Sequence, residues 1–340
     1  MSPTDKKITV PAEWAKQKAI WTAFPSHIEE GLWKGVIDVA QDEVAAMVKE
    51  LAKGQQVNVL TANETATVAA QKRLGGNANV KIIPARFGDI WLRDTGPIFA
   101  KDEAGNPVAL RFQTNGWGGK FLYQYDDEVG DTIADLSNTP IRRNTFILEG
   151  GSLEHDGEGT ILTTRQCLLN DNRNKGWTKE RAEQELCTAF GVSKILWLDE
   201  GLLNDHTDGH IDNIARFVAP TTIACQSPSD TDDPNTDTLN RIADTLSQMT
   251  DAKGRTIKVV RIPSPGLVTD DDGAPIPASH MNFIIGNETV VVPVYGTKSQ
   301  DEAVAALGKL FPTLRVVGCA SNTILSGGGS FHCITQQEPA

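Results

Sequence analysis

Cys333 has a setting that suits a nucleophile. It follows three consecutive glycines, Gly327–Gly329, and opens the β-branched run Cys-Ile-Thr. Glycine backbone reaches conformations closed to other residues and can approach a ligand closely, and a β-branched run is typical of a strand. A cysteine between such a loop and a strand can face a pocket, where a thiolate would need a base and electrostatic support from elsewhere in the chain. The alternative is a small buried hydrophobic residue, the usual role of a single cysteine.

A dense polar cluster, His-Thr-Asp-Gly-His-Ile-Asp, occupies residues 206–212. Two histidines four residues apart, together with aspartates, could bind a metal ion. They would share one face only in a helix, and Gly209 followed by β-branched residues disfavours a helix there. We therefore expect no metal. We expect His210 to act as an acid and base, and Asp212 to bind or orient the substrate.

A papain-like pairing of cysteine and histidine is the other arrangement to consider. It would need the cysteine early in the chain on a helix, whereas Cys333 comes last and precedes a strand. The acidic residues beside His210 would also oppose an oxyanion. Negative charge instead suits a cationic electrophile, and a guanidinium matches carboxylates two hydrogen bonds at a time. The residues thus favour attack of a thiolate on a guanidinium carbon held between carboxylates.

The elements that must position these residues repeat along the chain. Four hairpins are expected at 97–100 with 108–112, 152–155 with 160–164, 214–218 with 221–225, and 283–286 with 289–294. Each is followed by a segment with apolar residues at helical spacing and then by a short apolar strand. A fifth unit is split between the chain ends: the Cys333 segment supplies its first part, and a helix around 44–51 and a strand at 57–60 complete it.

Five such units, one completed from both chain ends, predict a closed α/β ring. A polar residue that does not fit a strand core stands at the start of each hairpin. These residues are Asp94, Glu149, His210 with Asp212, Asn282, and Cys333. In a ring they would converge on the axis and form one site. Nothing resembling a linker divides the chain, so residues 1–340 are expected to form a single domain.

Composition limits the partners and the location. The net charge of −12 argues against nucleic acid or an anionic membrane and suits a small cationic substrate. Five scattered cysteines without CxxC spacing indicate neither a disulfide framework nor a zinc motif. The N-terminal residues lack an apolar signal core, and no run is long enough to span a bilayer, so a cytoplasmic location is expected. The polar stretch 227–238 is expected to be a surface connection, and the Pro/Gly-rich stretch 263–277 a candidate lid.

Six motifs, in order, resemble the agmatine deiminases and the related bacterial peptidylarginine deiminases of the pentein superfamily. The resemblance covers nearly the whole chain and implies a five-bladed α/β propeller. The motifs are Pro-Ala-Glu-Trp at Pro11, Trp-Leu-Arg-Asp-Thr-Gly-Pro at Trp91, Trp-Gly-Gly-Lys at Trp117, Leu-Glu-Gly-Gly-Ser at Leu148, Thr-Asp-Gly-His-Ile-Asp at Thr207, and Gly-Gly-Gly-Ser-Phe-His-Cys-Ile-Thr-Gln-Gln at Gly327.

The resemblance implies a covalent mechanism. Cys333 would attack the guanidinium carbon, ammonia would leave, and water activated by His210 would hydrolyse the amidino-cysteine. Asp94 and Asp212 resemble the carboxylates that clamp the guanidinium, and Glu149 resembles the acid/base partner of His210. No cofactor is implied.

Other motif residues are less defined. Trp91 resembles a wall of the substrate channel. Asp89 and Asp208 are candidates for substrate binding, with support of the turns as the alternative. Arg93 is expected to pair with those two acids, and Trp117 to serve in packing. His280 stands where the family pattern has an aromatic residue, and Ser330-Phe331 follows the glycines where the family runs almost directly into the histidine.

The expected reaction is hydrolysis of agmatine to N-carbamoylputrescine and ammonia. Deimination of free or C-terminal peptidyl arginine is the alternative enzymatic function, and a non-catalytic pentein ring kept for binding is the alternative from another class. Arginine adds a carboxylate that needs a basic partner once desolvated, and Lys120 and His280 are the candidates for that role if arginine is the substrate. A homo-oligomer is possible on this interpretation.

Overall fold

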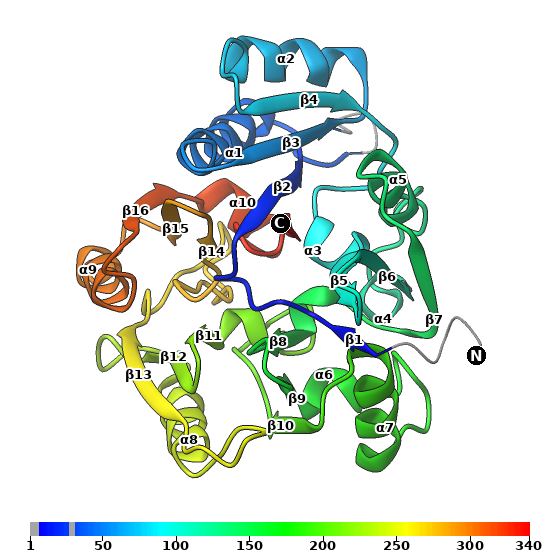
Figure 1. The fold of residues 1–340 in the computed structure, drawn as a ribbon. Coiled ribbons are helices and arrows are strands. Elements are labelled where there is room, and N and C mark those ends of the chain that lie inside the picture. The colour runs from blue at the N-terminus through cyan, green and yellow to red at the C-terminus, as the bar shows by residue number, and fades with distance from the viewer. Residues whose placement is uncertain (1–6, 27–30) are drawn as a thin grey trace.

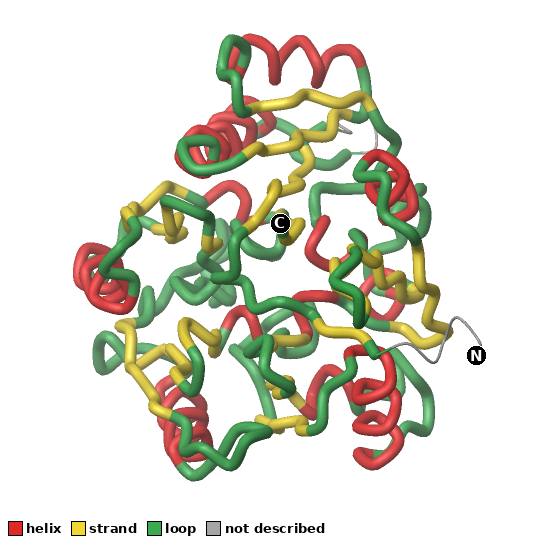
Figure 2. Tube along the Cα trace, in the orientation of Figure 1, coloured by secondary structure: helices red, strands yellow, loops and turns green. Residues whose placement is uncertain are grey.

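Five small β-sheets surround a common centre in the computed structural model, which describes residues 7–26 and 31–340 (Figure 1). The long helices lie at the periphery of the ring, and the strands lie nearer its centre (Figure 2). Among the described residues, no helix combines the length and the apolar character that crossing a bilayer requires. The ring confirms the prediction of five units around one axis.

The third unit shows the pattern on which the ring is built. Strands β11 (Ala215–Ala219) and β12 (Thr222–Ser227) form an antiparallel hairpin, and β13 (Lys258–Pro263) pairs parallel with β12. A parallel neighbour needs a crossover connection, which helix α8 (Thr236–Ser247) supplies. The apolar residues of α8 recur at helical spacing and are buried on one face, which packs against the sheet of the same unit.

The first, second and fourth units repeat this order of hairpin, helix and parallel strand. The first consists of α3 (Leu92–Thr95), β5 (Ile98–Asp102), β6 (Pro107–Gln113), α4 (Gly116–Gly119), α5 (Val129–Leu136) and β7 (Ile141–Ile147). The second consists of the 3-10 turn η3 (Gly150–Ser152), β8 (Leu153–His155), β9 (Thr160–Thr164), α6 (Arg165–Leu168), α7 (Lys179–Phe190) and β10 (Lys194–Leu198). The fourth consists of β14 (Ile284–Ile285), β15 (Thr289–Val294), α9 (Gln300–Leu310) and β16 (Arg315–Ala320).

Helix α7 shows how local sequence sets the ends of an element. The side chain of Thr178 accepts a hydrogen bond from the amide of Arg181 and caps the first turn. Gly191 ends the helix with φ of 65°, and an added Cβ there would lie 2.0 Å from the carbonyl oxygen of Ile8. Only glycine therefore fits this position, where the helix end meets the N-terminal segment.

The fifth sheet joins the two ends of the chain. Strand β17 (Thr335–Pro339) pairs antiparallel with β2 (Gln17–Ala23), and β2 pairs parallel with β3 (Gln56–Thr61) after helix α1 (Ile37–Leu51). In Figure 1 the C-terminal end accordingly lies near the centre of the ring, beside β2. This confirms the prediction of a unit split between both chain ends.

Several elements extend the predicted pattern. Strand β4 (Val80–Pro84) adds a fourth strand to the fifth sheet, and helix α2 (Glu64–Leu74) connects it to β3. Strand β1 (Ile8–Thr9) pairs with β5 at the edge of the first sheet, and helix α10 (Asn322–Ser326) precedes the glycine loop. The expected strand at 283–286 is reduced to β14. Helix α8 begins at Thr236, inside the stretch 227–238 that was expected to be a surface connection throughout. The first turn of the helix is polar, and its first buried residue is Leu239.

The stretch 263–277 folds back on itself through a bridge between Thr269 and Pro275. Val268 and Ile276 pack against Ala278, Tyr295 and Leu325. The proposal that this stretch is a lid stays a prediction.

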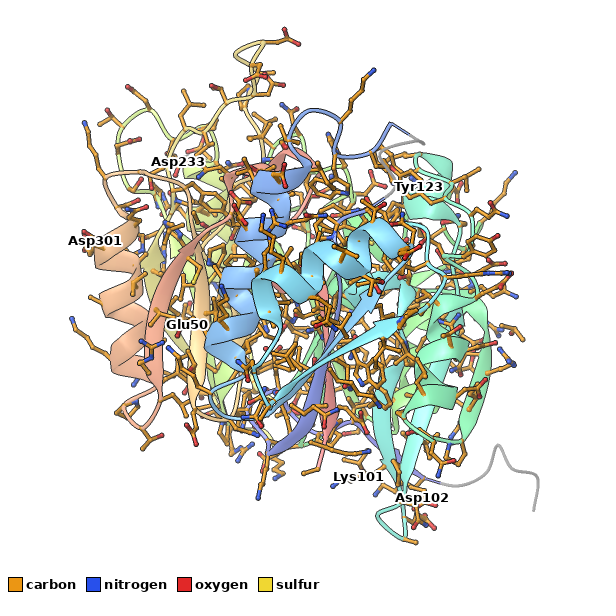
Figure 3. All side chains as sticks on the ribbon, turned by 90° about the horizontal axis from the view of Figure 1, so that it is seen from above. Glu50, Lys101, Asp102, Tyr123, Asp233 and Asp301 are labelled. Atoms are coloured by element: carbon orange, nitrogen blue, oxygen red, sulfur yellow. The ribbon has the colours of Figure 1, made fainter. Side chains whose placement is uncertain are left out.

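Figure 3 shows the ring edge-on, turned by 90° from Figure 1, so that its two faces lie at the top and at the bottom of the picture. Tyr123 and Asp233 lie toward one face, and Lys101 and Asp102, beside the turn of the β5–β6 hairpin, lie toward the opposite one (Figure 3). Tyr123 also lines a pocket that contains Cys333, so the entrance to that pocket is on the Tyr123 face.

Candidate active site

Cys333 lies in the turn between the glycine loop and β17, and its side chain is buried. The amide nitrogen Nδ2 of Asn282 donates to Sγ of Cys333 at 3.1 Å. A Cβ at Gly329 would lie 2.8 Å from the ring of Trp91 and 3.0 Å from Cβ of Cys333. The glycine therefore lets the loop pass between the indole and the thiol, which explains in part why glycines precede this cysteine.

Asp212 approaches the thiol from the second element of the site. The 3-10 turn η4 (Ile211–Asn213) places its carboxylate oxygen Oδ2 at 3.5 Å from Sγ of Cys333. The same oxygen lies 2.8 Å from Nδ1 of His332. The other oxygen, Oδ1, is buried and has no hydrogen-bond partner among the described residues. A buried carboxylate oxygen without a donor is costly, so Asp212 has capacity to bind a donor that enters the site.

Asp94 approaches from the first unit. Its two oxygens accept hydrogen bonds from the backbone amide of Gly151 and from Nε1 of Trp117, both at 2.8 Å. A Cβ at Gly151 would lie 2.6 Å from Nδ1 of His210, 2.9 Å from Oδ1 of Asp94 and 3.0 Å from Oδ2 of Asp212. Three polar side chains, one from the first unit and two from the third, therefore meet beside this glycine of the second unit, as the ring predicted.

His210 lies between two carboxylates. Its Nε2 is 3.4 Å from Oε2 of Glu149, and its Nδ1 is 3.8 Å from Oδ1 of Asp94. Arg173 fixes Glu149 from the other side, since its Nε donates to both oxygens of that carboxylate at 2.8 and 3.1 Å. Arg173 also donates to the carbonyl oxygen of Thr207 and pairs with Asp208. It thereby couples Glu149 to the loop that carries His210.

That loop is not helical. Asp208 and Gly209 both have positive φ, 65° and 82°, which takes the backbone out of the right-handed helical region. His206 lines the pocket, whereas His210 is buried beside Glu149. The two histidines therefore do not share a face, which was the reason for disfavouring a metal site between them.

The electrostatics set the protonation states at the base of the site. Burial alone would raise the pKa of Glu149, but the hydrogen bond to His210 and the charge of Arg173 outweigh it and hold this pKa below its usual range. Burial opposes the charged form of His210, yet Asp94 and Glu149 raise its pKa well above the usual value. At neutral pH, Glu149 is thus a carboxylate and His210 an imidazolium.

The two groups nearest the centre behave differently. Burial raises the pKa of the Cys333 thiol well above its usual value, and the charges of Asp212 and Asp94 raise it further. Burial also raises the pKa of Asp94, partly offset by His210, with Asp212 and Glu149 adding to the increase. For Asp212, burial would raise the pKa, but His332 and other cations lower it. The site therefore presents a neutral thiol among carboxylates, and a bound cation would relieve the repulsion between those carboxylates.

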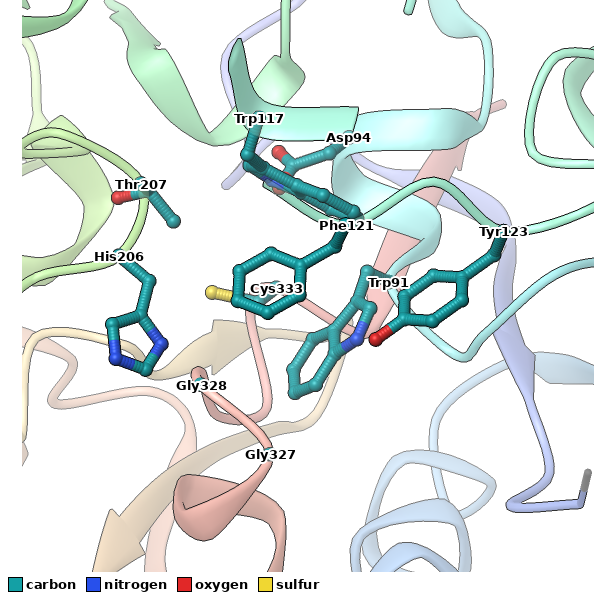
Figure 4. Close-up of a pocket in the computed structure, with 10 residues that line it drawn as sticks. All are labelled: Trp91, Asp94, Trp117, Phe121, Tyr123, His206, Thr207, Gly327, Gly328 and Cys333. Carbon is teal, nitrogen blue, oxygen red and sulfur yellow. The ribbon is translucent and has the colours of Figure 1, made fainter. Parts of the chain in front are cut away.

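A pocket leads to the thiol. Figure 4 shows the sulfur of Cys333 near its centre, with aromatic side chains on one side and His206 and Thr207 on the other. The lining residues are Trp91, Asp94, Trp117, Phe121, Tyr123, His206, Thr207, Gly327, Gly328 and Cys333. None of them is a lysine or an arginine. A flat cation fits such a pocket, because aromatic faces and a carboxylate both favour positive charge.

Asp89 and Asp208 do not line this pocket. Asp89 accepts hydrogen bonds from the indole nitrogens of Trp91 and Trp33, at 2.8 and 3.0 Å. Asp208 forms ion pairs with Lys120 and Arg173. Their contacts fit the alternative interpretation, in which these acids support the walls of the site rather than contact the substrate.

One expectation about a neighbouring residue was wrong, and another was incomplete, since Trp117 does pack in the core. Arg93 does not pair with Asp89 or Asp208; it donates to the carbonyl oxygen of His332 and to Gln337. Asp89 instead accepts hydrogen bonds from two indoles, and Asp208 pairs with Arg173. The order of residues in the motifs could not show these contacts. Trp117 does more than pack, because its indole nitrogen binds Asp94 and its ring lines the pocket.

His280 lies outside the pocket lining. It is fully buried, its Nδ1 faces the carbonyl oxygen of Pro293 at 2.8 Å, and its ring stacks on Tyr295. Burial lowers its pKa to about 4. His280 is therefore a neutral structural residue and offers no positive charge to a substrate.

Four residues of the site were not assigned roles from the sequence: Arg173, Cys167, Glu13 and His332. Arg173 has no sequence signal, because it lies outside the six motifs in a polar stretch. Cys167 places its Sγ 3.8 Å from Oε2 of Glu149. Glu13 and His332 do lie in motifs, in Pro-Ala-Glu-Trp and in His-Cys-Ile-Thr, and that position was a usable signal.

Among residues 7–26 and 31–340, two groups of side chains have a spacing that could hold a metal ion: Glu149 with Cys167 and His210, and Glu13 with Glu154 and His332. In both, a guanidinium already matches the negative charge. Arg173 binds Glu149, and Arg216 binds both Glu13 and Glu154. A metal ion would have to displace these buried cations.

The chain is similar to known proteins over almost its whole length. The family model for Porphyromonas-type peptidyl-arginine deiminase matches residues 9–339. An agmatine deiminase from Stutzerimonas stutzeri is 36% identical, over 100% of this chain and 97% of that protein. The structure of agmatine deiminase of Enterococcus faecalis, described as catalysing its reaction, superposes with a TM-score of 0.91 at 32% identity and covers 98% of this chain and 96% of that one. A cysteine-to-serine variant of the C. jejuni agmatine deiminase with substrate bound has a TM-score of 0.89 at 27% identity, over 98% and 97% of the chains.

Proposed function

The chain belongs to the family of Porphyromonas-type peptidyl-arginine deiminases, and we propose that it is an agmatine deiminase that forms N-carbamoylputrescine and ammonia. The observation that carries the proposal is the environment of Cys333. A neutral thiol lies beside Asp212, whose oxygen Oδ1 has no donor in the part of the chain that the structure describes, and Asp94 faces the same pocket. A guanidinium supplies the donors and the positive charge that this arrangement lacks.

Binding of the guanidinium prepares the nucleophile. The cation between Asp94 and Asp212 offsets the charges that raise the pKa of Cys333, so the thiol loses its proton more readily when substrate is present. Sγ then forms a bond to the guanidinium carbon, and the thiol proton passes to Asp212, 3.5 Å away. His210 gives its proton to the departing nitrogen, which leaves as ammonia.

Hydrolysis restores the enzyme. Neutral His210, held by Glu149, takes a proton from a water whose oxygen attacks the amidino carbon. The C–S bond breaks, and the sulfur recovers its proton from Asp212. The remaining proton of that water converts ammonia to ammonium, so the sum is guanidinium plus water giving a ureido group and ammonium.

The distal end of the pocket favours agmatine over arginine. Free arginine carries a carboxylate, and no lysine or arginine is among the described residues that line the pocket. Lys120 is committed to Asp208 and to the carbonyl oxygen of His206, and His280 is neutral and buried. An unpaired, desolvated carboxylate would cost several kcal/mol, so discrimination should exceed about a thousandfold.

The test compares agmatine, free arginine and a peptide ending in arginine in parallel. Ammonia release gives kcat/KM for each, and mass spectrometry identifies the ureido product. Turnover of agmatine at least about a thousandfold more efficient than that of either arginine substrate supports the proposal. Equal or better kcat/KM with either arginine substrate would replace it with the arginine deiminase alternative. Release of ammonia from none of the three would favour the non-catalytic ring.

Three further expectations belong to this proposal. Residues 1–340 form one domain, the protein works in the cytoplasm, and neither nucleic acid nor membrane is a partner. The net charge of −12 supports the last of these. A homo-oligomer remains open to measurement by sedimentation.

A further inference from the structure

His332 bridges two carboxylates behind the site. Its Nδ1 lies 2.8 Å from Oδ2 of Asp212, and its Nε2 lies 3.0 Å from Oε2 of Glu13. All three side chains are more than nine-tenths buried. Because each ring nitrogen faces a carboxylate oxygen, the ring cannot rotate without breaking its contact with Asp212 or with Glu13.

Glu13 is itself held in place. Its Oε1 accepts a hydrogen bond from the amide of Ile285 at 2.8 Å, and its Oε2 pairs with the buried guanidinium of Arg216. Arg216 also donates to the carbonyl oxygens of Met281 and Phe283, at 3.1 and 2.7 Å. These two residues flank Asn282, which donates to the sulfur of Cys333.

The arrangement defines the orientation of Asp212. One oxygen of Asp212 is fixed by His332, so the other, Oδ1, is left without a donor. If the carboxylate rotated, Oδ1 could take the hydrogen bond from His332, and the geometry facing Cys333 would change. Rigid support of a reacting group by buried neighbours is what keeps a site in its productive geometry.

We propose that His332 and Glu13 are positioning residues that act through Asp212 and hold its carboxylate in the orientation that receives the guanidinium. The proposal rests on the function proposed above and gives the Pro-Ala-Glu-Trp motif a role. Glu13 lies at the N-terminal side of the fifth unit, so this segment contributes to catalysis without touching the substrate.

Two substitutions at His332 separate its two hydrogen bonds. The amide nitrogen of asparagine takes the place of Nδ1, so His332→Asn keeps a donor for Asp212 and loses the one for Glu13. The amide nitrogen of glutamine takes the place of Nε2, so His332→Gln does the reverse. We expect kcat/KM to fall by about tenfold to a hundredfold in His332→Gln and by clearly less in His332→Asn. Equal losses in the two variants, or a greater loss in His332→Asn, would overturn the proposal.

Glu13 has a matched control in Glu154. Both acids bind Arg216, but of the two only Glu13 has a hydrogen bond with a ring nitrogen of His332. Glu13→Gln should lower kcat/KM by several-fold or more, whereas Glu154→Gln should leave it within about twofold while removing an equivalent partner of Arg216. Equal losses in both variants would show that Arg216, and not His332, carries the effect.

A double-mutant cycle tests whether the effect passes through Asp212. In an Asp212→Asn background, His332→Gln should cause little further loss, because the carboxylate that it positions is already gone. If His332→Gln lowers kcat/KM by the same factor in the Asp212→Asn background as in the wild type, His332 acts as a general structural residue. Circular dichroism and the thermal midpoint show whether each variant is folded; if His332→Gln does not fold, Glu13→Gln takes its place in the cycle.

A second measurement is independent of the natural substrate. Alkylation of Cys333 by cationic chloroacetamidine, relative to neutral iodoacetamide, reports how well the carboxylates receive a planar cation. Peptide mass spectrometry distinguishes Cys333 from the other cysteines. The ratio of the alkylation rate with chloroacetamidine to that with iodoacetamide should fall in His332→Gln and stay near the wild-type value in Glu154→Gln. If agmatine is not turned over but the ratio behaves in this way, the proposed function fails and the positioning role stands. An unchanged ratio in His332→Gln would refute the positioning role alone.

Discussion

Asp94→Asn removes a negative charge from the pocket and keeps the size of the side chain. The carboxylate accepts hydrogen bonds from Gly151 and Trp117 on separate oxygens. Asparagine has one acceptor oxygen, so one of these donors would face an amide NH₂ group instead. Loss of a buried acceptor should lower the free energy of unfolding by about 1–3 kcal/mol. Relief of the repulsion from Asp212 and Glu149, which raises the pKa of Asp94, should offset part of that loss.

The kinetic effect has a separate origin. A desolvated, charge-assisted pair with the guanidinium is worth about 2–4 kcal/mol, which corresponds to a loss of roughly thirtyfold to a thousandfold in kcat/KM. The pKa of His210 should also fall, because Asp94 is among the charges that raise it. Initial rates of ammonia release at agmatine concentrations far below KM give kcat/KM directly.

Asp251→Asn is the matched control. Asp251 is buried and accepts from the amides of Lys253 and Arg255 in a turn between α8 and β13, outside the pocket lining. Its variant should lose thermal stability and keep kcat/KM within about twofold, since it removes no charge from the pocket. If Asp94→Asn keeps kcat/KM within threefold of wild type while folded, Asp94 does not clamp the substrate.

Three other outcomes follow from the structure. Cys333→Ala should abolish turnover while keeping the fold, and quenched wild-type enzyme should show an amidino adduct at Cys333; near wild-type activity of the variant would disprove the covalent mechanism. Dialysis against a chelator should leave activity intact, and a stoichiometric metal whose removal abolishes turnover would contradict the chemistry proposed. Burial, with Asp89 nearby, raises the pKa of Asp126 to about 7. The stability that the protonated form of Asp126 contributes is fully present below its ordinary pKa of 3.8 and is lost as the pH rises to about 7. Asp126→Asn should therefore flatten the pH dependence of the thermal midpoint between these two pH values. An unchanged pH dependence would count against the raised pKa of Asp126.

The ring could be predicted from the sequence because each of its first four units is formed by consecutive residues. A hairpin, a helix and a strand that follow one another leave turn residues and apolar spacing in sequence order, as α8 with Leu239, Ile242 and Leu246 shows. Strand β14 was less well predicted, because only Ile284–Ile285 pair with β15 and the residues before them serve the site. The extra strand β4 lies outside the repeating unit, so the repeat could not indicate it.

The residues at the centre of the site were found because each stands where a polar side chain interrupts an apolar pattern. Their supporting contacts were not, because they join residues far apart in the chain. Arg173 binds Glu149 across 24 positions, and His332 binds Glu13 across 319. Such pairs depend on how five units close around an axis, and nothing in the local sequence of Arg173 marks it. Arg93 was misassigned for the same reason, since its partner Gln337 lies 244 positions away.

The pairing of β17 with β2 also has a consequence for when activity can arise. The hydroxyl group of Thr22 donates to the carbonyl oxygen of Ile334, 312 positions later. At about 5–20 residues per second, synthesis of that interval takes about 15–60 s. During this time strand β2 has only its parallel partner β3, and the first four sheets receive their last strand when synthesis reaches Ala320. A ribosome-bound chain that ends before Cys333 can therefore form most of the ring, but it has neither the thiol nor the strand that orders it, so catalysis cannot begin before the fifth sheet closes.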